Sequence, residues 1–220
     1  MADRRELDRD QSFRKATLAL LKCLIATGNS HKAEEIRRLL AGQPMELVDL
    51  SSFEGIEEPE ETGSTFLENA LIKSRYYSAA TGLIALADDS GLEVDALNGE
   101  PGIYSSRFAG EGTSHDVKMD KILSLLQDTP PEERTARFRC VAVATFPDGQ
   151  EIQAEGAMEG RIFKKKRGEG GFGYDPIVYI PELEKTVAEL TEQEKDRYSH
   201  RGKAFRSLAQ LFSKQISTGR

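Results

Sequence analysis

The sequence predicts an α/β fold, because segments typical of strands and segments typical of helices alternate along the chain. Apolar runs typical of buried strands occur at residues 20–26, 46–50 and 82–87. Between them, apolar residues recur at helical spacing over 33–41, and a second helix is predicted to start near Thr65. The first half of the chain therefore predicts strands interspersed with helices.

The size and composition of the chain are those of a globular protein. It has 220 residues, of which 38% are hydrophobic, and a formal net charge of −7, which disfavours disorder and extensive binding to nucleic acid. Cys23 and Cys140 lie in apolar runs without metal-type spacing, which predicts reduced thiols in a cytoplasmic protein. The apolar run 18–26 is too short to span a membrane. We expect residues 1–19 to form a charged extension and residues 20–220 to form one domain.

The predicted helices of the first half have recognisable ends. The helix over 33–41 ends at Gly42, and Thr65 with Glu68 forms a capping box that opens a helix ending before Gly82. A third helix is predicted over 113–127. Its apolar side is predicted to carry Val117, Ile122, Leu125 and Leu126.

The second half of the chain begins with a predicted hairpin. Strands over 138–146 and 151–158 are joined by a turn of Pro, Asp, Gly and Gln, and 177–180 is another short strand. A capping box at Thr191 opens a short helix, and Ser199 caps the final one. The core side of the final helix is predicted to contain Ala204, Phe205, Leu208, Leu211 and Phe212.

Two adjacent carboxylates, Asp88 and Asp89, follow the apolar run 82–87 and precede Ser90 and Gly91. In open α/β sheets ligands bind beyond the carboxyl ends of strands, so these acids are predicted to face a cleft. Side chains alternate along extended backbone, so one carboxylate would enter the cleft while the other braces the loop. The alternative is an ordinary surface turn, since this residue combination is typical of turns.

A second candidate site is the turn between the first strand and helix. A turn rich in Gly, Asn and Ser before a helix presents free N–H groups and the positive end of the helix dipole, which together suit an anion. Lys32 in the first helical turn favours the same interpretation. A plain strand-to-helix turn is the alternative, and the glycine spacing excludes a P-loop.

A glycine-rich loop over 168–173 matches the dinucleotide-binding fingerprint literally. No strand directly precedes it, and the Pro176 that follows cannot open the required helix, so the match is rejected. We interpret the loop as one that delivers Phe172, Tyr174 and Asp175 to a ligand. The basic run 164–167 is interpreted as a solvated loop.

Five short motifs occur in the order found in one family. They are Thr27-Gly28-Asn29 with Lys32; Glu60-Glu61-Thr62-Gly63 with Thr65-Phe66 and Glu68-Asn69-Ala70; Ala87-Asp88-Asp89-Ser90-Gly91; Gly171-Phe172-Gly173-Tyr174-Asp175-Pro176; and Ser199-His200-Arg201-Gly202. Over residues 20–212 the chain resembles the inosine/xanthosine triphosphate pyrophosphatases, above all their bacterial branch. These enzymes clear deaminated purine nucleotides.

The resemblance implies an elongated mixed sheet flanked by helices, two lobes with a central cleft, and a homodimer. It implies that Asp89 is the catalytic carboxylate. The implied phosphate contacts are Thr27, Gly28, Asn29, Ser30, His31 and Lys32, with Ser90 as a further substrate contact. The implied sugar and base contacts are Phe172, Gly173, Tyr174, Asp175, Lys195, His200 and Arg201. His31 is a departure, because relatives often carry a small residue or lysine there.

The implied reaction fits the residue chemistry. Cleavage between the α and β phosphates needs charge neutralisation and an aligned water, which Mg²⁺ with one or two carboxylates can provide. Asp89 either binds the metal or takes the proton of the water, and Glu60 is the second metal candidate, ahead of Glu61. Arg201, a donor only, favours a purine carbonyl over an amino group, and Phe172 offers a face for stacking.

The predicted function is therefore hydrolysis of ITP, dITP and XTP to the monophosphate and pyrophosphate. Two alternatives stay open: a related pyrophosphatase acting on other modified nucleotides, and a nucleotide-binding module without catalysis. Neither nucleic acid nor a membrane is an expected partner.

Overall fold

The computed structural model describes residues 21–218, so the predicted extension over 1–19 lies outside the described residues. A mixed sheet of seven strands occurs in this part of the chain, in the order β2-β1-β3-β4-β5-β6-β7. The strands are β1 (Leu21–Ile25), β2 (Met45–Asp49), β3 (Ile84–Val94), β4 (Thr135–Thr145), β5 (Glu151–Ile162), β6 (Val178–Ile180) and β7 (Lys185–Thr186). β1 pairs with β2 and β3 in parallel, whereas all pairs from β3 onward are antiparallel.

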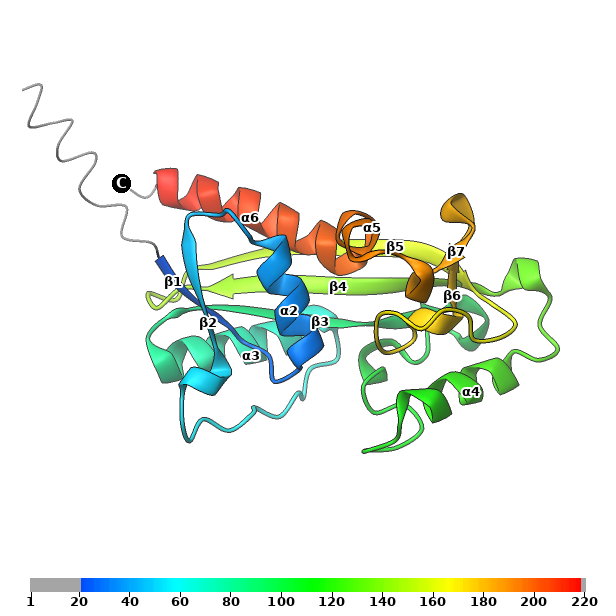
Figure 1. The fold of residues 1–220 in the computed structure, drawn as a ribbon. Coiled ribbons are helices and arrows are strands. Elements are labelled where there is room, and N and C mark those ends of the chain that lie inside the picture. The colour runs from blue at the N-terminus through cyan, green and yellow to red at the C-terminus, as the bar shows by residue number, and fades with distance from the viewer. Residues whose placement is uncertain (1–20, 219–220) are drawn as a thin grey trace, which may run out of the picture.

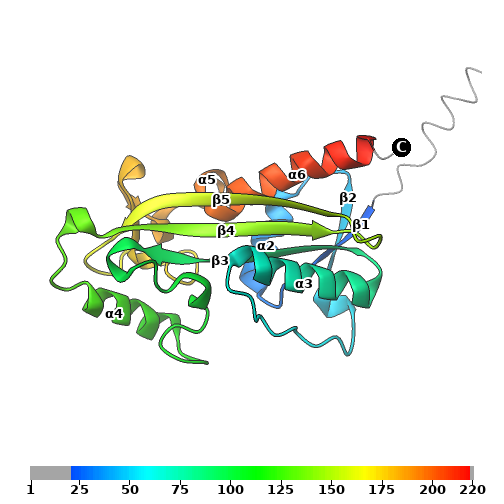
Figure 2. The same cartoon turned by 180° about the vertical axis from the view of Figure 1, so that it is seen from behind.

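Helices flank both sides of the sheet. They are α2 (Ser30–Leu39), α3 (Phe66–Thr81), α4 (His115–Leu125), α5 (Glu192–Tyr198) and α6 (His200–Thr218). α6 runs along β4 and β5, whereas α3 lies behind them and packs on β3 and β4 (Figures 1 and 2). The capping box predicted at Thr191 forms completely with Glu194. At α3 Thr65 caps the helix by accepting from the Glu68 N–H, but the Glu68 carboxylate accepts from the Ser64 N–H, so the predicted box is only half formed.

The long strands β3, β4 and β5 connect the two largest hydrophobic clusters of the described residues, one in each lobe. In the first lobe, α2 and α6 bury Ile36, Phe205 and Phe212 against the sheet. In the second lobe, α4 and the β6 region bury Ile122 and Val178 against the other halves of the long strands. The structure thus confirms an elongated α/β fold with a mixed sheet (Figure 1).

Several sequence predictions about elements are wrong. On α6, Leu211 was predicted on the core side but is 39% exposed. The strand predicted over 82–87 does not end before the acids, and the alternative of a surface turn is also wrong. Asp88 to Gly91 form the middle of β3, because β4 pairs with β3 without interruption from Ala85 to Val94. On α4, Val117 and Leu125 are half exposed, at 52% and 51%. The buried side of α4 instead contains Met119, Ile122 and Leu126, which share one helical face.

Among the helices of residues 21–218, none is both long and apolar enough to cross a bilayer.

Candidate functional site

An uncovered edge of β3 places the two acids at a cleft. β1 pairs with β3 only from Ile84 to Leu86, and then turns away at Thr27. β3 continues to Val94, and the next partner on this edge is an isolated bridge at Glu93. The edge of β3 is therefore uncovered beside the acids because the neighbouring strand ends, although their own strand continues. Both carboxylates are nevertheless buried, at 1% exposure for Asp88 and 6% for Asp89.

Asp88 and Asp89 point to opposite sides of the sheet, as the alternation of strand side chains predicts. The Asp88 carboxylate lies 3.3 Å from the Lys32 ammonium and 3.1 Å from the Arg201 guanidinium, on the side of α2 and α6. The Asp89 carboxylate accepts a hydrogen bond of 3.1 Å from the Asn69 amide and lies 3.7 Å from the Lys73 ammonium, both on α3.

Asp89 opens into a polar cavity of about 600 Å³ between the two sides of the cleft. The cavity is lined by Thr27, Gly28, Asn29, Ser30, Lys32, Glu58, Glu61, Lys73, Asp89, Ser90, Ile103 and Ser106. Burial raises the pKa of Asp89, and Lys73 and Lys32 oppose that effect. A carboxylate facing two lysines in one hollow suits a polyphosphate bound through a cation.

The acidic loop before α3 contributes Glu58 and Glu61 to this cavity. Glu61 pairs with the Lys73 ammonium at 2.5 Å. Glu60, the favoured second metal candidate, is exposed and does not line the cavity, so the structure favours Glu61 over it. Within residues 21–218 no group of three metal-ligating side chains is assembled. Mg²⁺ needs only one or two carboxylates beside substrate phosphates and water, so Asp89 and Glu61 fit that ion.

The predicted anion turn forms at the start of α2, but three of its N–H groups donate to side chains of the turn itself. The Asn29 side chain caps the helix and accepts from the N–H groups of His31 and Lys32, and Thr27 Oγ1 accepts from the Asn29 N–H. These N–H groups are therefore not free for a ligand. Thr27, Gly28, Asn29, Ser30 and Lys32 line the polar cavity, but His31 does not.

An adjoining, more apolar cavity holds the residues predicted to contact the base. Its volume is about 100 Å³, and it shares Asn29, Lys32, Ser90 and Ser106 with the polar cavity. The predicted residues that line it are Phe172, Gly173, Tyr174, Asp175, Lys195, His200 and Arg201. Leu92, Phe138 and His115 also line it, and no sequence motif predicted them as site residues.

His200 is held as a neutral ring at this cavity. Its imidazole stacks on Phe138 with 4.9 Å between ring centroids, and its buried Nδ1 has no hydrogen-bond partner among the described residues. Burial, together with Arg201 and Lys195, lowers the pKa of His200 well below its usual value. A neutral imidazole can either donate to or accept from a bound base.

The guanidinium of Arg201 donates most of its hydrogen bonds to protein side chains, whereas the sequence predicted a base contact. Nε and Nη2 donate to Asp88 at 3.3 and 3.1 Å, Nη2 also donates to Ser90 at 2.8 Å, and Nη1 donates to Glu35 at 2.5 Å. One Nη1 hydrogen has no acceptor among the described residues. Removing Arg201 would also leave two buried carboxylates without this partner, so Arg201→Ala does not isolate base recognition.

Glu35 is a site residue that the sequence analysis missed. It is 6% exposed, and it bonds both Arg201 and, at 2.8 Å, the Lys195 ammonium, which in turn lies 2.7 Å from Asp175. Burial opposes its ionisation, but Arg201 and Lys195 lower the pKa of Glu35 below its usual value. Charges of alternating sign thus connect the two cavities. In chain order they are Lys32, Glu35, Asp88, Asp175, Lys195 and Arg201.

Asn69 and Lys73 were also missed as site residues. They are four residues apart on the predicted α3 helix and therefore share a face, which was an available signal. Gly63 N–H donates to Asn69 Oδ1 at 2.8 Å, which leaves the amide NH₂ to face Asp89. A Cβ at Gly63 would lie 2.6 Å from that oxygen, so this approach requires glycine.

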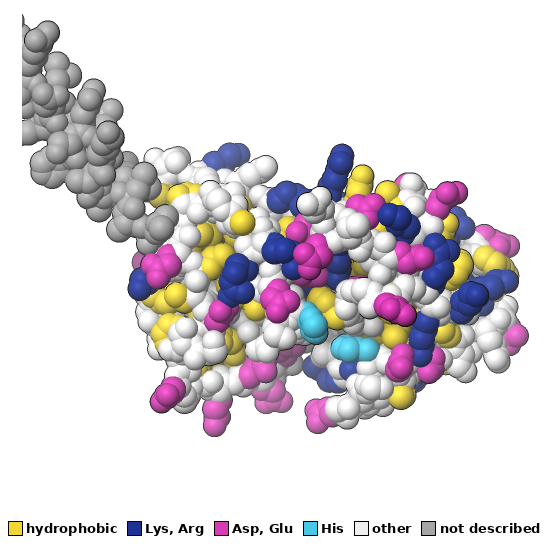
Figure 3. Space-filling view, viewed as in Figure 1, with side chains coloured by type: hydrophobic (Ala, Val, Ile, Leu, Met, Phe, Trp, Pro, Cys, Tyr) yellow, Lys and Arg dark blue, Asp and Glu magenta, His cyan; other side chains and the backbone are white. Residues whose placement is uncertain are grey.

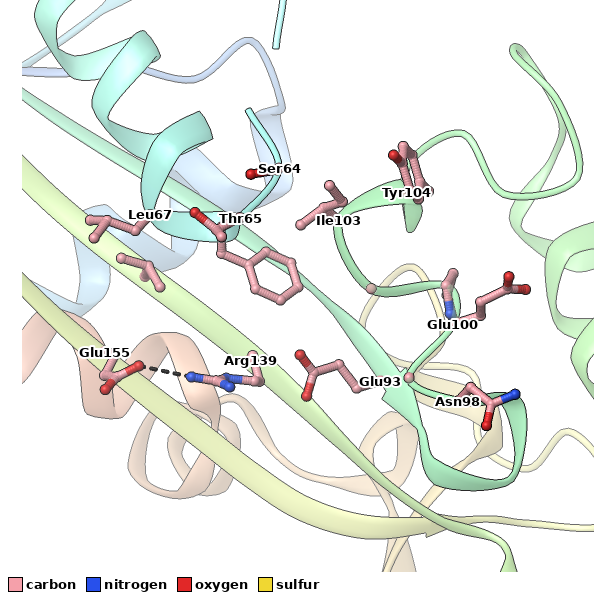
Figure 4. A pocket seen from close by; sticks show the side chains of 15 residues that line it. Ser64, Thr65, Leu67, Glu93, Asn98, Glu100, Ile103, Tyr104, Arg139 and Glu155 are labelled. Carbon is pink, nitrogen blue, oxygen red and sulfur yellow. Dashed lines mark hydrogen bonds and ion pairs between the residues drawn. The ribbon is translucent and has the colours of Figure 1, made fainter. Parts of the chain in front are cut away.

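A second large hollow, of about 630 Å³, lies between the start of α3 and the loop over 98–104 (Figure 4). Its polar wall contains Glu93, Glu100 and an ion pair of 2.9 Å between Arg139 and Glu155. Its apolar wall contains Leu67, Ile103 and Tyr104. The negative charges of Glu93 and Glu100 would repel a polyphosphate. This hollow therefore differs from the polar cavity at Asp89, which suits one.

Comparison with known proteins adds a family and several relatives. The sequence profile of the Ham1 family matches residues 23–211. The chain is 51% identical to the dITP/XTP pyrophosphatase of Thioalkalivibrio sulfidiphilus over 86% of this chain and 96% of that relative. It is 50% identical to the dITP/XTP pyrophosphatase of Thermus thermophilus over 87% and 92% of the two chains.

Solved structures of similar proteins superpose on most of this chain. A HAM1 protein from Coxiella burnetii superposes with a TM-score of 0.81 at 40% identity and covers 89% of this chain and 100% of that one. A nucleoside-triphosphatase, also titled dITP/XTP pyrophosphatase, from Mycobacterium abscessus superposes with a TM-score of 0.69 at 43% identity, over 87% and 98%.

Proposed function

The chain belongs to the Ham1 family, and from this premise we propose that it hydrolyses deaminated purine nucleoside triphosphates to the monophosphate and pyrophosphate. The proposed substrates are ITP, dITP and XTP. The observation that carries the proposal is the pair of adjoining cavities, because one offers lysines and carboxylates and the other offers aromatic rings. A nucleoside triphosphate has this same division between a charged and a flat end.

In the proposed reaction the polar cavity binds the triphosphate. Lys32 and Lys73 face the phosphate oxygens and neutralise their charge. The hydroxyl groups of Thr27 and Ser30 offer hydrogen bonds to the same oxygens. Asp89, held by Asn69 and facing this cavity, orients the attacking water or holds a cation beside it. Cleavage breaks the bond between the α and β phosphates and releases pyrophosphate.

We assign Mg²⁺ as the cofactor, with Asp89 and Glu61 as the residues that would hold it. When bound, the ion would neutralise phosphate charge and lower the pKa of the attacking water. Glu61 and the Lys73 ammonium with which it pairs both line the cavity, so Lys73 lies beside the carboxylates that would hold the ion.

In the base cavity we propose that the purine stacks on Phe172 and presents its carbonyl to donors. The remaining Nη1 hydrogen of Arg201 and the neutral ring of His200 are the groups available for it. An amino group in place of the carbonyl would leave a buried donor facing a donor, which costs about 1–3 kcal/mol.

Product analysis tests the reaction type. With ITP and Mg²⁺ we expect equal amounts of IMP and pyrophosphate, and no product after chelation with EDTA. Release of IDP and phosphate would contradict the proposed bond cleavage. Tight binding of ITP without product would indicate the non-catalytic alternative, and turnover of modified pyrimidine nucleotides alone would indicate the related pyrophosphatase.

We also propose that the protein is a cytoplasmic homodimer. The buried, unpaired thiols of Cys23 and Cys140 are compatible with a reducing compartment. The hollow of Figure 4 presents an exposed Tyr104, at 55%, next to Ile103 and across from Leu67, which makes it our candidate dimer surface. Light scattering after gel filtration should give twice the chain mass, and Tyr104→Glu should lower it. An unchanged dimer in that variant would exclude this surface.

A further inference from the structure

His31 lies in the phosphate-binding turn but does not face the phosphate cavity. The other residues of the turn, Thr27 to Ser30 and Lys32, line that cavity. The exposed His31 ring instead stacks on Phe172, with 5.2 Å between ring centroids and 13° between ring planes. Figure 3 shows two histidine side chains close together in the middle of this face; His31 and His115 are the exposed histidines, whereas His200 is buried.

Phe172 belongs to a loop that needs external support. Three glycines of this loop, Gly168, Gly171 and Gly173, have positive φ values, and the loop forms neither a helix nor a strand. Inside the loop, the Phe172 N–H donates to the Asp175 carboxylate at 3.0 Å, which fixes the backbone. The ring itself is fixed by neighbours from other elements: His31 stacks on it, and the Lys195 ammonium lies 4.5 Å from its centroid.

The position of His31 separates it from the nucleotide. Phe172 lines the base cavity, whereas His31 lines neither of the two cavities. His31 therefore acts on the cleft through the Phe172 ring. It connects the first turn of α2, in one lobe, to the loop that carries the aromatic surface of the base cavity.

We propose that His31 is a positioning residue that holds Phe172 as the stacking surface for the purine, an inference that rests on the proposed function. The implied phosphate contact at this position is thereby replaced by a role in base binding. A stacked aromatic pair changes an equilibrium about two- to tenfold, so loss of the His31 ring should weaken binding of base-bearing ligands by that factor. Binding of inorganic tripolyphosphate, which has no base, should not change.

The test compares His31→Ala with His31→Phe, which restores a ring. We expect His31→Ala to lower kcat/KM for ITP about two- to tenfold through KM, and His31→Phe to recover it. The inhibition constant of inorganic tripolyphosphate should stay at the wild-type value in both. Glu34→Ala, an exposed change on the same helix, is the matched control and should match the wild type throughout.

A double-mutant cycle with Phe172→Ala shows whether His31 acts through that ring. In the Phe172→Ala background, His31→Ala should cause no further loss, because its partner is already absent. Additive losses, weaker binding of tripolyphosphate in His31→Ala, or failure of His31→Phe to restore KM would each overturn the proposal.

A spectroscopic measurement separates this inference from the proposed function. The chain has three histidines, so the ring protons of His31 can be assigned by NMR. Phe172→Leu should shift the His31 signals, because the ring current of Phe172 is lost. Unshifted signals would overturn the stacking itself, whereas shifted signals in a protein that does not hydrolyse ITP would overturn only the proposed function.

Discussion

Asp88 and Asp89 are adjacent in the sequence, but their pKa values are shifted in opposite directions. Both are buried, which disfavours the charged form. Lys32 and Arg201 overcome this effect for Asp88 and lower its pKa well below its usual value. For Asp89 burial prevails and its pKa is raised. Asp88 thus serves as a permanent anion that organises cations, whereas Asp89 lines the polar cavity and is the proposed catalytic carboxylate.

The first prediction concerns that chemistry. Asp89→Asn should fold with a melting temperature close to the wild type and lose about 10²- to 10⁴-fold in kcat/KM for ITP, because the amide can neither take a proton nor bind a cation as a carboxylate does. Pyrophosphate release and thermal melting measure the two effects. Asp128→Asn, at an exposed position, is the control. Turnover near the wild-type rate by folded Asp89→Asn would remove Asp89 from the mechanism.

The second prediction concerns Glu35, whose pKa in the folded protein is lowered by Arg201 and Lys195. Its stabilising effect is complete above the pKa of the unfolded chain and is lost as the pH falls through the folded pKa. Glu35→Gln leaves two buried cations without this partner, so we expect a loss of about 3 kcal/mol at pH 7. Urea unfolding should show the difference from the wild type shrinking as the pH falls below about 4.3, the pKa of an unperturbed glutamate. A difference that grows in acid would contradict this expectation.

Among the elements, the start of α6 packs closely on β5 because residue 156 of that strand is a glycine. A Cβ at Gly156 of β5 would lie 2.3 Å from the His200 carbonyl oxygen and 2.8 Å from the Ala204 nitrogen. The first turn of α6 carries His200 and Arg201, so their place in the base cavity depends on this close approach of helix and strand.

Gly156→Ala should therefore damage stability and base binding together. We expect a loss of about 1–3 kcal/mol in the free energy of unfolding, because overpacking moves the helix, and a raised KM for ITP. Gln153→Ala, at an exposed position of the same strand, is the control and should change stability by less than about 0.5 kcal/mol. Equal stability and KM in Gly156→Ala and the wild type would show that α6 is not positioned in this way.

The elements also show what the sequence alone could predict. The caps at Thr65 and Thr191 depend on residues three positions away, so the starts of α3 and α5 were predicted from local signals. The length of β3 could not be predicted from local signals, because it depends on pairing with β4, which lies some fifty residues later in the chain. The contact of Glu35 with Arg201 joins residues 166 positions apart, so the residues could not reveal it without the fold.

At the scale of the whole molecule, the site is built from elements of both lobes that meet beside β3. The phosphate turn precedes α2, the acid-binding residues lie on α3, and the base cavity combines the loop at Phe172 with the start of α6. Every candidate site residue lies at or after Thr27, and β1 begins at Leu21.

Removal of residues 1–16 should consequently leave function intact. We expect the truncated protein to keep its melting temperature within about 2 °C and its kcat/KM for ITP within about twofold, since the change spares both cores and all site residues. Calorimetry and a pyrophosphate assay would measure the two quantities. A folded but inactive truncated protein would show that the extension reaches the cleft.

The central claim is that the cleft selects deaminated purine triphosphates, and a substrate panel tests it most directly. The measurement is kcat/KM of the wild-type protein for ITP, dITP, XTP, ATP and GTP with Mg²⁺, by pyrophosphate release. We expect kcat/KM for ITP, dITP and XTP to exceed that for ATP by at least about tenfold, which corresponds to one buried donor left facing the adenine amino group. ATP hydrolysed as efficiently as ITP would contradict it.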